Sequence, residues 1–307
     1  MNRILLVASK SSRLWRDDED GFIFHWNVFM FREMWKSREL VWNLVKRDLK
    51  TRYKSSALGF FWSFGKPLFL MLILWFVFTT VLRLPQFNER NPKMPFTLHL
   101  LTGILVWSFF TGGLMDAMHS IYANSNLVKK VKLDAAVFPI SSVLANLVNH
   151  LLALLVLFCF MIGFKAPFGG YIFLLPVVIL LQTFFMITLS LFLSSLYIFY
   201  RDVGSIVEIL LTGWFYATPI IYPFWLAEEA IPEKLGQTVY YLYLLNPITP
   251  IVVAYRRLLF HSLLNPPEMP DARLLYYLLY AFLLSGFFYI LFRRLFRHYA
   301  LRFADEL

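Results

Sequence analysis

The chain has 307 residues, of which 59% are hydrophobic, 19% are aromatic and only 16% are charged. A soluble domain carries roughly 25% charged residues, so this composition excludes that class and predicts an all-α membrane protein. The net charge of +10 does not indicate nucleic-acid binding, because the cations flank apolar stretches, as membrane topology requires. The single cysteine, Cys159, lies in an apolar run, which excludes a disulfide framework within one chain.

Residues 1–37 are predicted to form a cytoplasmic extension of mixed polarity. A short apolar patch at residues 4–8 is followed by the charged run 16–20, and this order is not that of a cleavable signal peptide. Aromatic residues near the end of the extension suggest a short piece on the membrane surface.

Residues 38–56 are predicted to form an amphipathic interface helix. Apolar side chains cover one side of this helix, and four cations cluster on the opposite side, namely Lys46, Arg47, Lys50 and Lys54. Asp48 and Arg52 are four residues apart in the favourable order, so they can pair locally. Such a helix lies in a membrane interface or against a partner, and a solvated surface helix is the alternative.

Six apolar segments are long enough to cross the hydrocarbon layer, which takes about 20 helical residues. They cover about 60–83, 98–119, 139–163, 172–198, 204–222 and 273–292. We therefore expect a transmembrane domain over residues 38–300 and a short tail over 301–307.

The distribution of cations predicts the orientation of these spans. With six spans and a cytoplasmic N-terminus, 21 of the 29 Lys and Arg residues fall on the cytoplasmic side. The reverse topology would place this excess outside, against the positive-inside tendency. We expect both termini in the cytoplasm and the chain in the bacterial inner membrane.

Residues 223–272 are apolar enough in part to enter a membrane but are broken by prolines. The stretch YYLYLLNPITPIVVAYRRLLF covers residues 240–260 and is interrupted at Asn246-Pro247 and at Pro250. We expect two short re-entrant helices before the last span, buried in protein or lining a wet cavity. A seventh span is the alternative, and it would move the C-terminal arginine cluster outside.

Motifs of phosphate binding and catalysis are absent from the sequence. There is no G-x-x-x-x-G-K-[ST] loop to hold nucleotide phosphates, and no H-E-x-x-H or G-x-S-x-G. We therefore expect no catalytic residue, metal site or cofactor on this chain. Four ionisable residues lie within predicted spans and are functional candidates by default, namely Asp116, His119, His150 and Glu208. Asp116 and His119 are three residues apart, which favours a local pair.

Four stretches together resemble the membrane subunit of ABC-2 type polysaccharide exporters, the permeases for O-antigen, capsule and teichoic acid. They are RDLKTRYKSSALGFFWSFGKPL at 47–68, NSNLVKKVKL at 124–133 with FPISSV at 138–143, YRDVGSIVEILLTGWFYATPIIYP at 200–223, and NPITPIVVAYRRLLF at 246–260. The resemblance covers about residues 38–300. The family often has a Pro-Arg pair at the position of residues 133–136. This chain lacks that pair, so it departs from the family pattern in the loop that the resemblance assigns to the ATPase contact.

The resemblance implies a homodimer with a channel at the interface, lined mainly by the first and fifth spans. Each copy would bind a separate ABC ATPase subunit, which carries the ATP and Mg²⁺. The implied cargo is a lipid-linked polysaccharide, and membrane lipids are further partners.

Charged residues at the cytoplasmic face are the candidates for the ATPase contact. They are Arg47, Lys50, Lys54, Lys129, Lys130, Lys132, Asp134, Arg201 and Asp202. Two alternatives stay open, because the lysines could instead anchor the loop at anionic lipid, and Asp202 could simply cap the fifth span.

Aromatic residues of the first and fifth spans are the candidate channel lining, because sugar rings stack their C–H faces on aromatic rings. They are Phe69, Trp75, Phe76, Trp214, Phe215 and Tyr216. Facing the lipid is the alternative for each of them. The candidate outer gate comprises Asn246, Pro247, Pro250, Tyr255 and Arg256.

Two other functions fit parts of the same pattern. One is an ABC-2 exporter of a lipid, a drug or a lipo-oligosaccharide. The other is a membrane-embedded glycan transferase, which requires paired catalytic side chains near one membrane face. The loops contain scattered acids, namely Asp134, Asp202, Glu228, Glu229 and Glu233, without a paired constellation.

Overall fold

The structure is a computed structural model that describes residues 38–54, 62–82, 95–130, 134–264, 267–300 and 302–307. The predicted extension 1–37 lies outside the described residues. The chain divides into two units, Met1–Asn43 and Leu44–Leu307, and every contact discussed below lies within the second. All regular elements of the described ranges are helical, which confirms the predicted all-α class.

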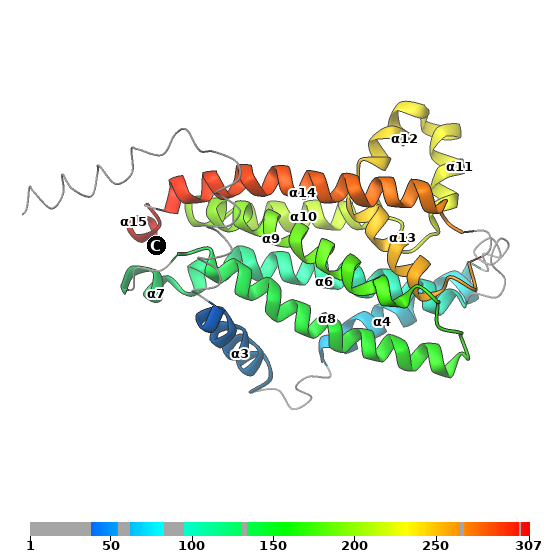
Figure 1. The fold of residues 1–307 in the computed structure, drawn as a ribbon, viewed down its shortest axis with the longest axis horizontal. Coiled ribbons are helices and arrows are strands. Elements are labelled where there is room, and N and C mark those ends of the chain that lie inside the picture. Colours follow the sequence, from blue (N-terminus) through cyan, green and yellow to red (C-terminus); the bar gives the residue numbers. More distant parts are fainter. Residues whose placement is uncertain (1–37, 55–61, 83–94, 131–133, 265–266, 301) are drawn as a thin grey trace, which may run out of the picture. The chain divides into compact units, whose positions relative to one another are not determined.

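Helices occupy each of the six predicted apolar segments (Figure 1). Four of them are long and apolar enough to cross a membrane: α6 (Phe96–Ala123), α8 (Val137–Gly163), Ile172–Phe199 and α14 (Asp271–Ala300). The third of these joins a 3₁₀ turn, η3 (Ile172–Leu174), to α9 (Leu175–Phe199). The chain is therefore a multi-pass membrane protein.

The two remaining apolar helices are shorter. One is α4 (Trp62–Phe76), which contains Pro67 and continues as a π-helical stretch, η2 (Val77–Val81). The other is α10 (Val203–Tyr216). The predicted fifth span, 204–222, is thus helical only as far as Tyr216, and a non-helical segment, 217–223, follows it.

Short helices lie at the two ends of the bundle (Figure 1). One end carries α7 (Ser125–Lys130), α15 (Phe303–Glu306) and part of α3 (Arg38–Lys54). The other end carries α11 (Phe224–Leu235), α12 (Gln237–Leu244) and α13 (Ile248–Leu259). Gly236, at φ +88°, separates α11 from α12, and this conformation favours glycine because it has no Cβ.

The broken stretch 240–260 forms two helices, α12 and α13, with the break at Leu245–Pro247. The expected interruption at Pro250 does not occur, because this proline falls in the first turn of α13, where proline is tolerated. Each helix is too short to cross the hydrocarbon layer alone. Pro247 immediately precedes α13, where its missing N–H costs nothing. Most of α13 is buried, so this helix belongs to the packed core.

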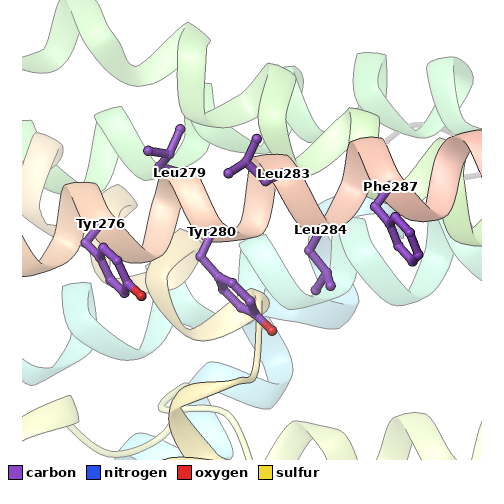
Figure 2. A pocket seen from close by; sticks show the side chains of 6 residues that line it. All are labelled: Tyr276, Leu279, Tyr280, Leu283, Leu284 and Phe287. Atoms are coloured by element: carbon purple, nitrogen blue, oxygen red, sulfur yellow. The ribbon is translucent and has the colours of Figure 1, made fainter. Parts of the chain in front are cut away.

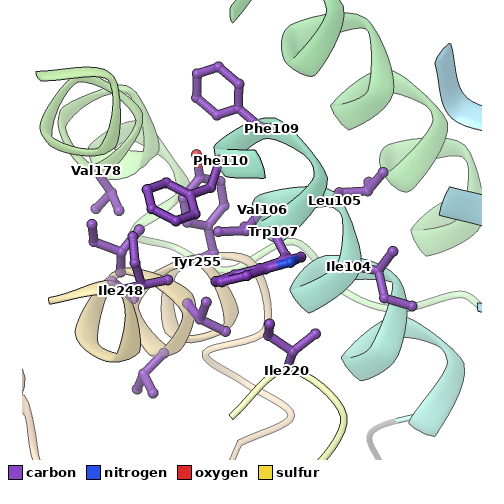
Figure 3. Close-up of a cluster of buried hydrophobic side chains, with 14 of the residues drawn as sticks. Ile104, Leu105, Val106, Trp107, Phe109, Phe110, Val178, Ile220, Ile248 and Tyr255 are labelled. Carbon is purple, nitrogen blue, oxygen red and sulfur yellow. The ribbon is translucent and has the colours of Figure 1, made fainter. Parts of the chain in front are cut away.

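The core forms around α6, which packs against α4, α8 and α9, while α14 packs against α9. Figure 3 shows Val106, Trp107 and Phe110 of α6 beside Val178 of α9 and Tyr255 of α13. The helices meet through side chains of all sizes, and Phe110 and Tyr255 are among the largest that are fully buried. Such interdigitation is what holds membrane helices together, since lipid supplies no hydrophobic drive between them.

Candidate functional site

A polar seam joins α3 to α6 and α8. Arg52 of α3 donates to Asp116 Oδ2 of α6 at 2.5 Å and to Asn146 Oδ1 of α8 at 3.2 Å. Asn146 closes the triangle by donating to Asp116 at 2.9 Å. Three helices are therefore tied together by charge-assisted bonds, which are stronger than neutral ones.

The same seam continues to the start of α7. Arg47 donates to Asn124 Oδ1 at 2.8 Å, and Asn124 lies between α6 and α7. Arg47 also contacts Asp48 at 3.2 Å. The expected local pair of Asp48 with Arg52 is absent among the described contacts, because Arg52 binds the more distant Asp116.

His119 does not pair with Asp116 in the described structure, contrary to expectation. Its Nδ1 lies 2.7 Å from the Met115 carbonyl oxygen, and its ring meets the Tyr197 ring edge-on at 4.5 Å. Asp116 turns instead toward the cation of α3. Asp116 therefore forms a contact between helices in place of the expected contact within α6.

Asp134 connects the loop before α8 to α14. Its carboxylate accepts hydrogen bonds from both terminal nitrogens of Arg293, of which the longer measures 3.3 Å. Burial raises the pKa of Asp134, but the hydrogen bond and charge of Arg293 outweigh it and leave this pKa below the ordinary value. Arg293 was not among the predicted site residues, and only its place in the basic tail pointed to it.

The other predicted ATPase contacts are spread over the same end of the bundle. Lys50, Lys129, Arg201 and Asp202 are exposed. The guanidinium of Arg201 lies 4.8 Å from the centre of the Tyr122 ring, and Asp202 precedes α10 without a capping hydrogen bond. The Lys54 and Lys130 side chains, and all of Lys132, lie outside the described residues.

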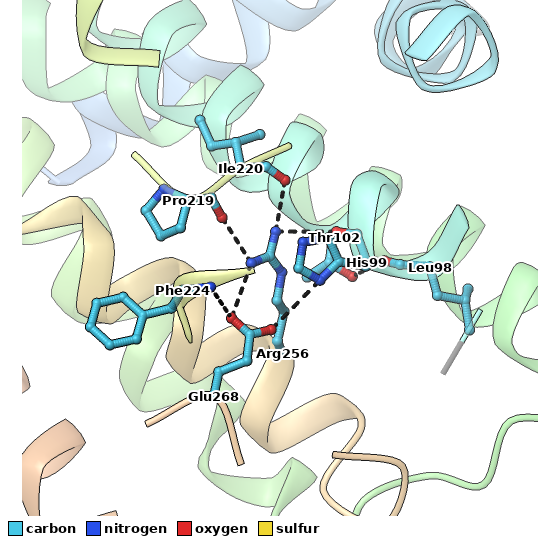
Figure 4. Close-up of polar contacts among 8 residues, drawn as sticks. All are labelled: Leu98, His99, Thr102, Pro219, Ile220, Phe224, Arg256 and Glu268. Atoms are coloured by element: carbon cyan, nitrogen blue, oxygen red, sulfur yellow. Dashed lines mark hydrogen bonds and ion pairs between the residues drawn. The ribbon is translucent and has the colours of Figure 1, made fainter. Parts of the chain in front are cut away.

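At the opposite end, Arg256 is fully buried at 0% exposure. It donates to the carbonyl oxygens of Pro219 and Ile220, both at 2.8 Å, and to the His99 carbonyl at 3.4 Å (Figure 4). Its counter-ion is Glu268, at 3.4 Å. Because an isolated buried charge is strongly disfavoured, the pair must act as a unit.

Asn246 secures the turn between α12 and α13. Its side-chain oxygen accepts from Trp214 Nε1 at 2.9 Å and from the Ile248 N–H at 3.0 Å. Its amide donates to Thr218 Oγ1 at 2.9 Å and to the Ala217 carbonyl at 3.2 Å. The turn is thus bound to the end of α10.

Tyr255 forms the third polar junction of α13. Its hydroxyl donates to Gln182 Oε1 of α9 at 3.0 Å and lies 3.0 Å from His150 Nε2 of α8. Gln182 in turn donates to the Val106 carbonyl of α6 at 2.9 Å. All five predicted gate residues lie in this half-buried to buried region, and Pro247 and Pro250 are both buried.

The structure divides the predicted channel aromatics into two groups. Phe69, Trp75 and Phe76 of α4 and Tyr216 of α10 are exposed on the single chain. Trp214 instead meets Phe110 edge-on at 5.3 Å, and Phe215 meets Trp107 at 5.8 Å. These two rings therefore contribute to packing within one chain.

One exposed face of α10 is polar. Ser205, Glu208, Thr212 and Tyr216 follow one another at helical spacing and are all exposed, with the exposed side chain of Ile209 at their edge. We call Ser205, Glu208, Thr212 and Tyr216 the α10 stripe. A purely lipid-facing surface would carry apolar side chains there, so this face is suited to a wet path or a protein contact.

A shallow groove of about 330 Å³ lies on α14 (Figure 2). Its six lining residues all come from this one helix and run from Tyr276 to Phe287. No charged side chain lines the groove, and Tyr280 donates to the Leu245 carbonyl at 3.3 Å. The groove suits apolar chains and carries none of the polar junctions described above.

Comparison with known proteins identifies the family. The sequence profile described as ABC-2 type transporter matches residues 39–260. The chain belongs to the ABC-2 type transporter family. This confirms the resemblance seen in the sequence, and membership makes the chain a transporter membrane subunit with an ABC ATPase as its implied partner.

Curated relatives of this ABC-2 permease are named O-antigen export system permease protein RfbA. One, from Myxococcus xanthus, is 32% identical over 245 residues, which cover 80% of this chain and 87% of the relative. Two from Klebsiella pneumoniae are 30% and 31% identical over 224 residues, covering 72% of this chain and 80% of each relative.

Proposed function

We propose that this ABC-2 permease is the membrane subunit of an ATP-driven exporter of lipid-linked polysaccharide across the bacterial inner membrane. The observation that carries the proposal is the α10 stripe, which presents hydroxyl and carboxylate groups on an exposed face of a short apolar helix. Sugar hydroxyls can exchange hydrogen bonds with such groups. The names of the relatives supply the class of cargo.

The proposed pathway lies between two copies of the chain. A polar face within a bilayer needs cover from protein or water, and one copy leaves the α10 stripe open. Two copies placed face to face would enclose it, with the exposed aromatic face of α4 at the side. In this arrangement six helical spans of each copy cross the membrane. They are the four long helices together with two shorter ones, α4 with η2 and α10.

The proposed ATPase site is the end of the bundle formed by α3, α7 and the 200–202 turn. Each of these elements carries an exposed cation, Lys50, Lys129 and Arg201 in turn, and the polar seam joins α3 to α6 and α8, which supports the proposal. ATP and Mg²⁺ would be bound by the ATPase. The excess of Lys and Arg supports a cytoplasmic location for this end and for both termini.

A gene deletion combined with affinity purification tests the proposal. Deletion should remove the surface glycan and leave its lipid-linked precursor inside, and the intact chain supplied in trans should restore export. The tagged chain should also recover an ABC ATPase from solubilised membranes. Unchanged surface glycan together with recovery of the chain alone would overturn the proposal.

A further inference from the structure

The segment between α10 and α11 depends on side chains for its hydrogen bonding. Residues 217–223 are non-helical, so the carbonyl groups of Pro219 and Ile220 lack helical partners. Such groups are costly to leave unmet in an apolar environment. Both accept from one buried guanidinium, that of Arg256 on α13.

Glu268 completes the attachment from the other side of the segment. Its Oε2 faces Arg256 Nη1 at 3.4 Å and also accepts from the Phe224 N–H at 3.1 Å, where α11 begins. Its other oxygen lies 3.6 Å from His99 Nδ1 of α6. The Arg256–Glu268 pair therefore holds both the middle and the end of this non-helical segment (Figure 4).

The fit around this pair is tight. Gly103 of α6 faces it, and a Cβ atom at this position would lie 2.8 Å from the Ile220 carbonyl oxygen and 2.9 Å from Arg256 Nη2. Real Cβ contacts are essentially never that short, so even alanine would displace the segment or the guanidinium. The absence of a side chain at Gly103 thus allows α6 to approach the Arg256 guanidinium and the Ile220 carbonyl this closely.

We propose that Arg256 and Glu268 are positioning residues that fix segment 217–223 against α6 and α13 and thereby set the end of the α10 stripe. The inference rests on the proposed function insofar as the stripe lines the pathway. Asn246 holds the first part of the segment through Ala217 and Thr218, so α13 and the turn before it hold the first half of the segment, and Glu268 holds its far end at Phe224. Movement of α13 must then move the end of α10.

Cysteine accessibility measures this positioning directly. The reporter is Ile220→Cys in a Cys159→Ser background, since Ile220 is fully buried and Cys159 is exposed. Maleimide labelling of the reporter thiol is followed on the purified chain in detergent, and export is measured in cells. The test variants are Arg256→Met combined with Glu268→Gln, which leaves no lone buried charge, and Gly103→Ala, which leaves both charges in place.

Arg257→Met is the matched control. Arg257 is the next residue on α13, but its guanidinium pairs with Asp271 at 2.9 Å and 3.0 Å and does not touch the segment. The double variant removes the donor to the Pro219 and Ile220 carbonyls, and Gly103→Ala displaces it. Each should raise labelling of the reporter thiol by about tenfold, which corresponds to about 1.4 kcal/mol, and reduce export, with recovery of the partner ATPase unchanged. The control should leave the labelling of this thiol at the parent rate.

Two results would overturn the positioning role. One is parent-level labelling in both test variants. The other is full export by the double variant, which would mean that Arg256 and Glu268 only neutralise each other's charge and do not position the segment for export. Failure of the proposed function is distinguishable, because the unsubstituted chain would then not export at all while the labelling comparison still stands.

Discussion

At the scale of single residues, the hydroxyl of Tyr255 joins three helices. It donates to Gln182 and faces His150, whose ring also stacks on Phe109 with centroids 4.6 Å apart. Each partner is buried, so none can turn to water as a substitute. The hydroxyl therefore contributes to a unique packing of α13 on α8 and α9.

Tyr255→Phe tests this junction. The substitution keeps the ring but leaves a buried acceptor on Gln182 unpaired, which should lower the free energy of unfolding by about 1–3 kcal/mol. The measurement is the apparent melting temperature of the purified chain in detergent. Tyr241→Phe is the control, because Tyr241 is 64% exposed and its substitution should leave the melting temperature unchanged. Equal melting temperatures for both variants would contradict the assigned role.

The Asp134–Arg293 pair predicts a stability that depends on pH. The folded-state pKa of Asp134 lies below its ordinary value, so its contribution is complete above about pH 4 and is lost as the pH falls through the lowered pKa. Asp134→Asn should lower the melting temperature at pH 7, and this difference should shrink at acid pH. Asp202→Asn, at an exposed position, should show no such trend. A difference that does not change with pH would contradict the ion pair.

At the scale of elements, α3 is fastened to the bundle by charge. Leu44 and Val45 are buried, and Arg52 crosses to Asp116 and Asn146. A helix fixed to α6 and α8 in this way can transmit a push from a bound partner to both. We therefore expect α3 to act as a lever as well as a membrane anchor.

A charge exchange tests the lever. Arg52→Asp and Asp116→Arg should each reduce export while the chain still inserts, because each leaves two like charges facing each other. The double variant should recover part of the export, since it restores the opposite charges. Insertion is measured by yield in the membrane fraction and export by surface glycan. Equal loss of insertion and export in the single variants would mean that α3 is only a membrane anchor, which would contradict its role as a lever.

The α10 stripe gives a second prediction at this scale. Glu208→Leu removes the only carboxylate of the stripe and should reduce export while leaving the melting temperature near that of the parent, because the side chain is exposed on one chain. Leu210→Ala is the control, since Leu210 is also exposed but lies off the stripe. Reduced export in both variants to the same degree would contradict a special role for the stripe.

Helix positions follow from apolar runs, whereas the polar contacts do not. The spans from Phe96 to Ala300 stand out because a membrane helix needs a long uncharged stretch. The partner of Arg52 could not be derived, because spacing reveals contacts within a helix and Asp116 is on another one. Glu268 gave no signal at all, since a lone acid in a loop is ordinarily solvated.

The aromatic residues show the same limit. Their aromatic character made both Trp214 and Tyr216 candidates for the channel lining. The Trp214 ring packs inside the chain, whereas Tyr216 is exposed. Which way a side chain points on a helix depends on where its neighbours pack. The polarity of the neighbouring positions Ser205, Glu208 and Thr212 was the better signal for the exposed face of α10.

At the scale of the whole molecule, polar junctions at the two ends of the bundle share helices. The α3 end reaches α6 and α8 through Asp116 and Asn146, and the α13 end reaches the same two helices through His99 and His150. Rigid helices with specific contacts at both ends can carry a displacement from one end to the other. An ABC ATPase bound at the α3 end, as proposed above, would require such a route.

ATP-dependent translocation in inverted membrane vesicles tests the central claim most directly. In such vesicles the cytoplasmic face is outside, so a glycosidase added to the medium digests lipid-linked glycan before transport. The account predicts that ATP makes the glycan resistant to digestion only when both this chain and its ATPase are present. Resistance without ATP, or equal resistance in vesicles that lack the chain, would contradict it.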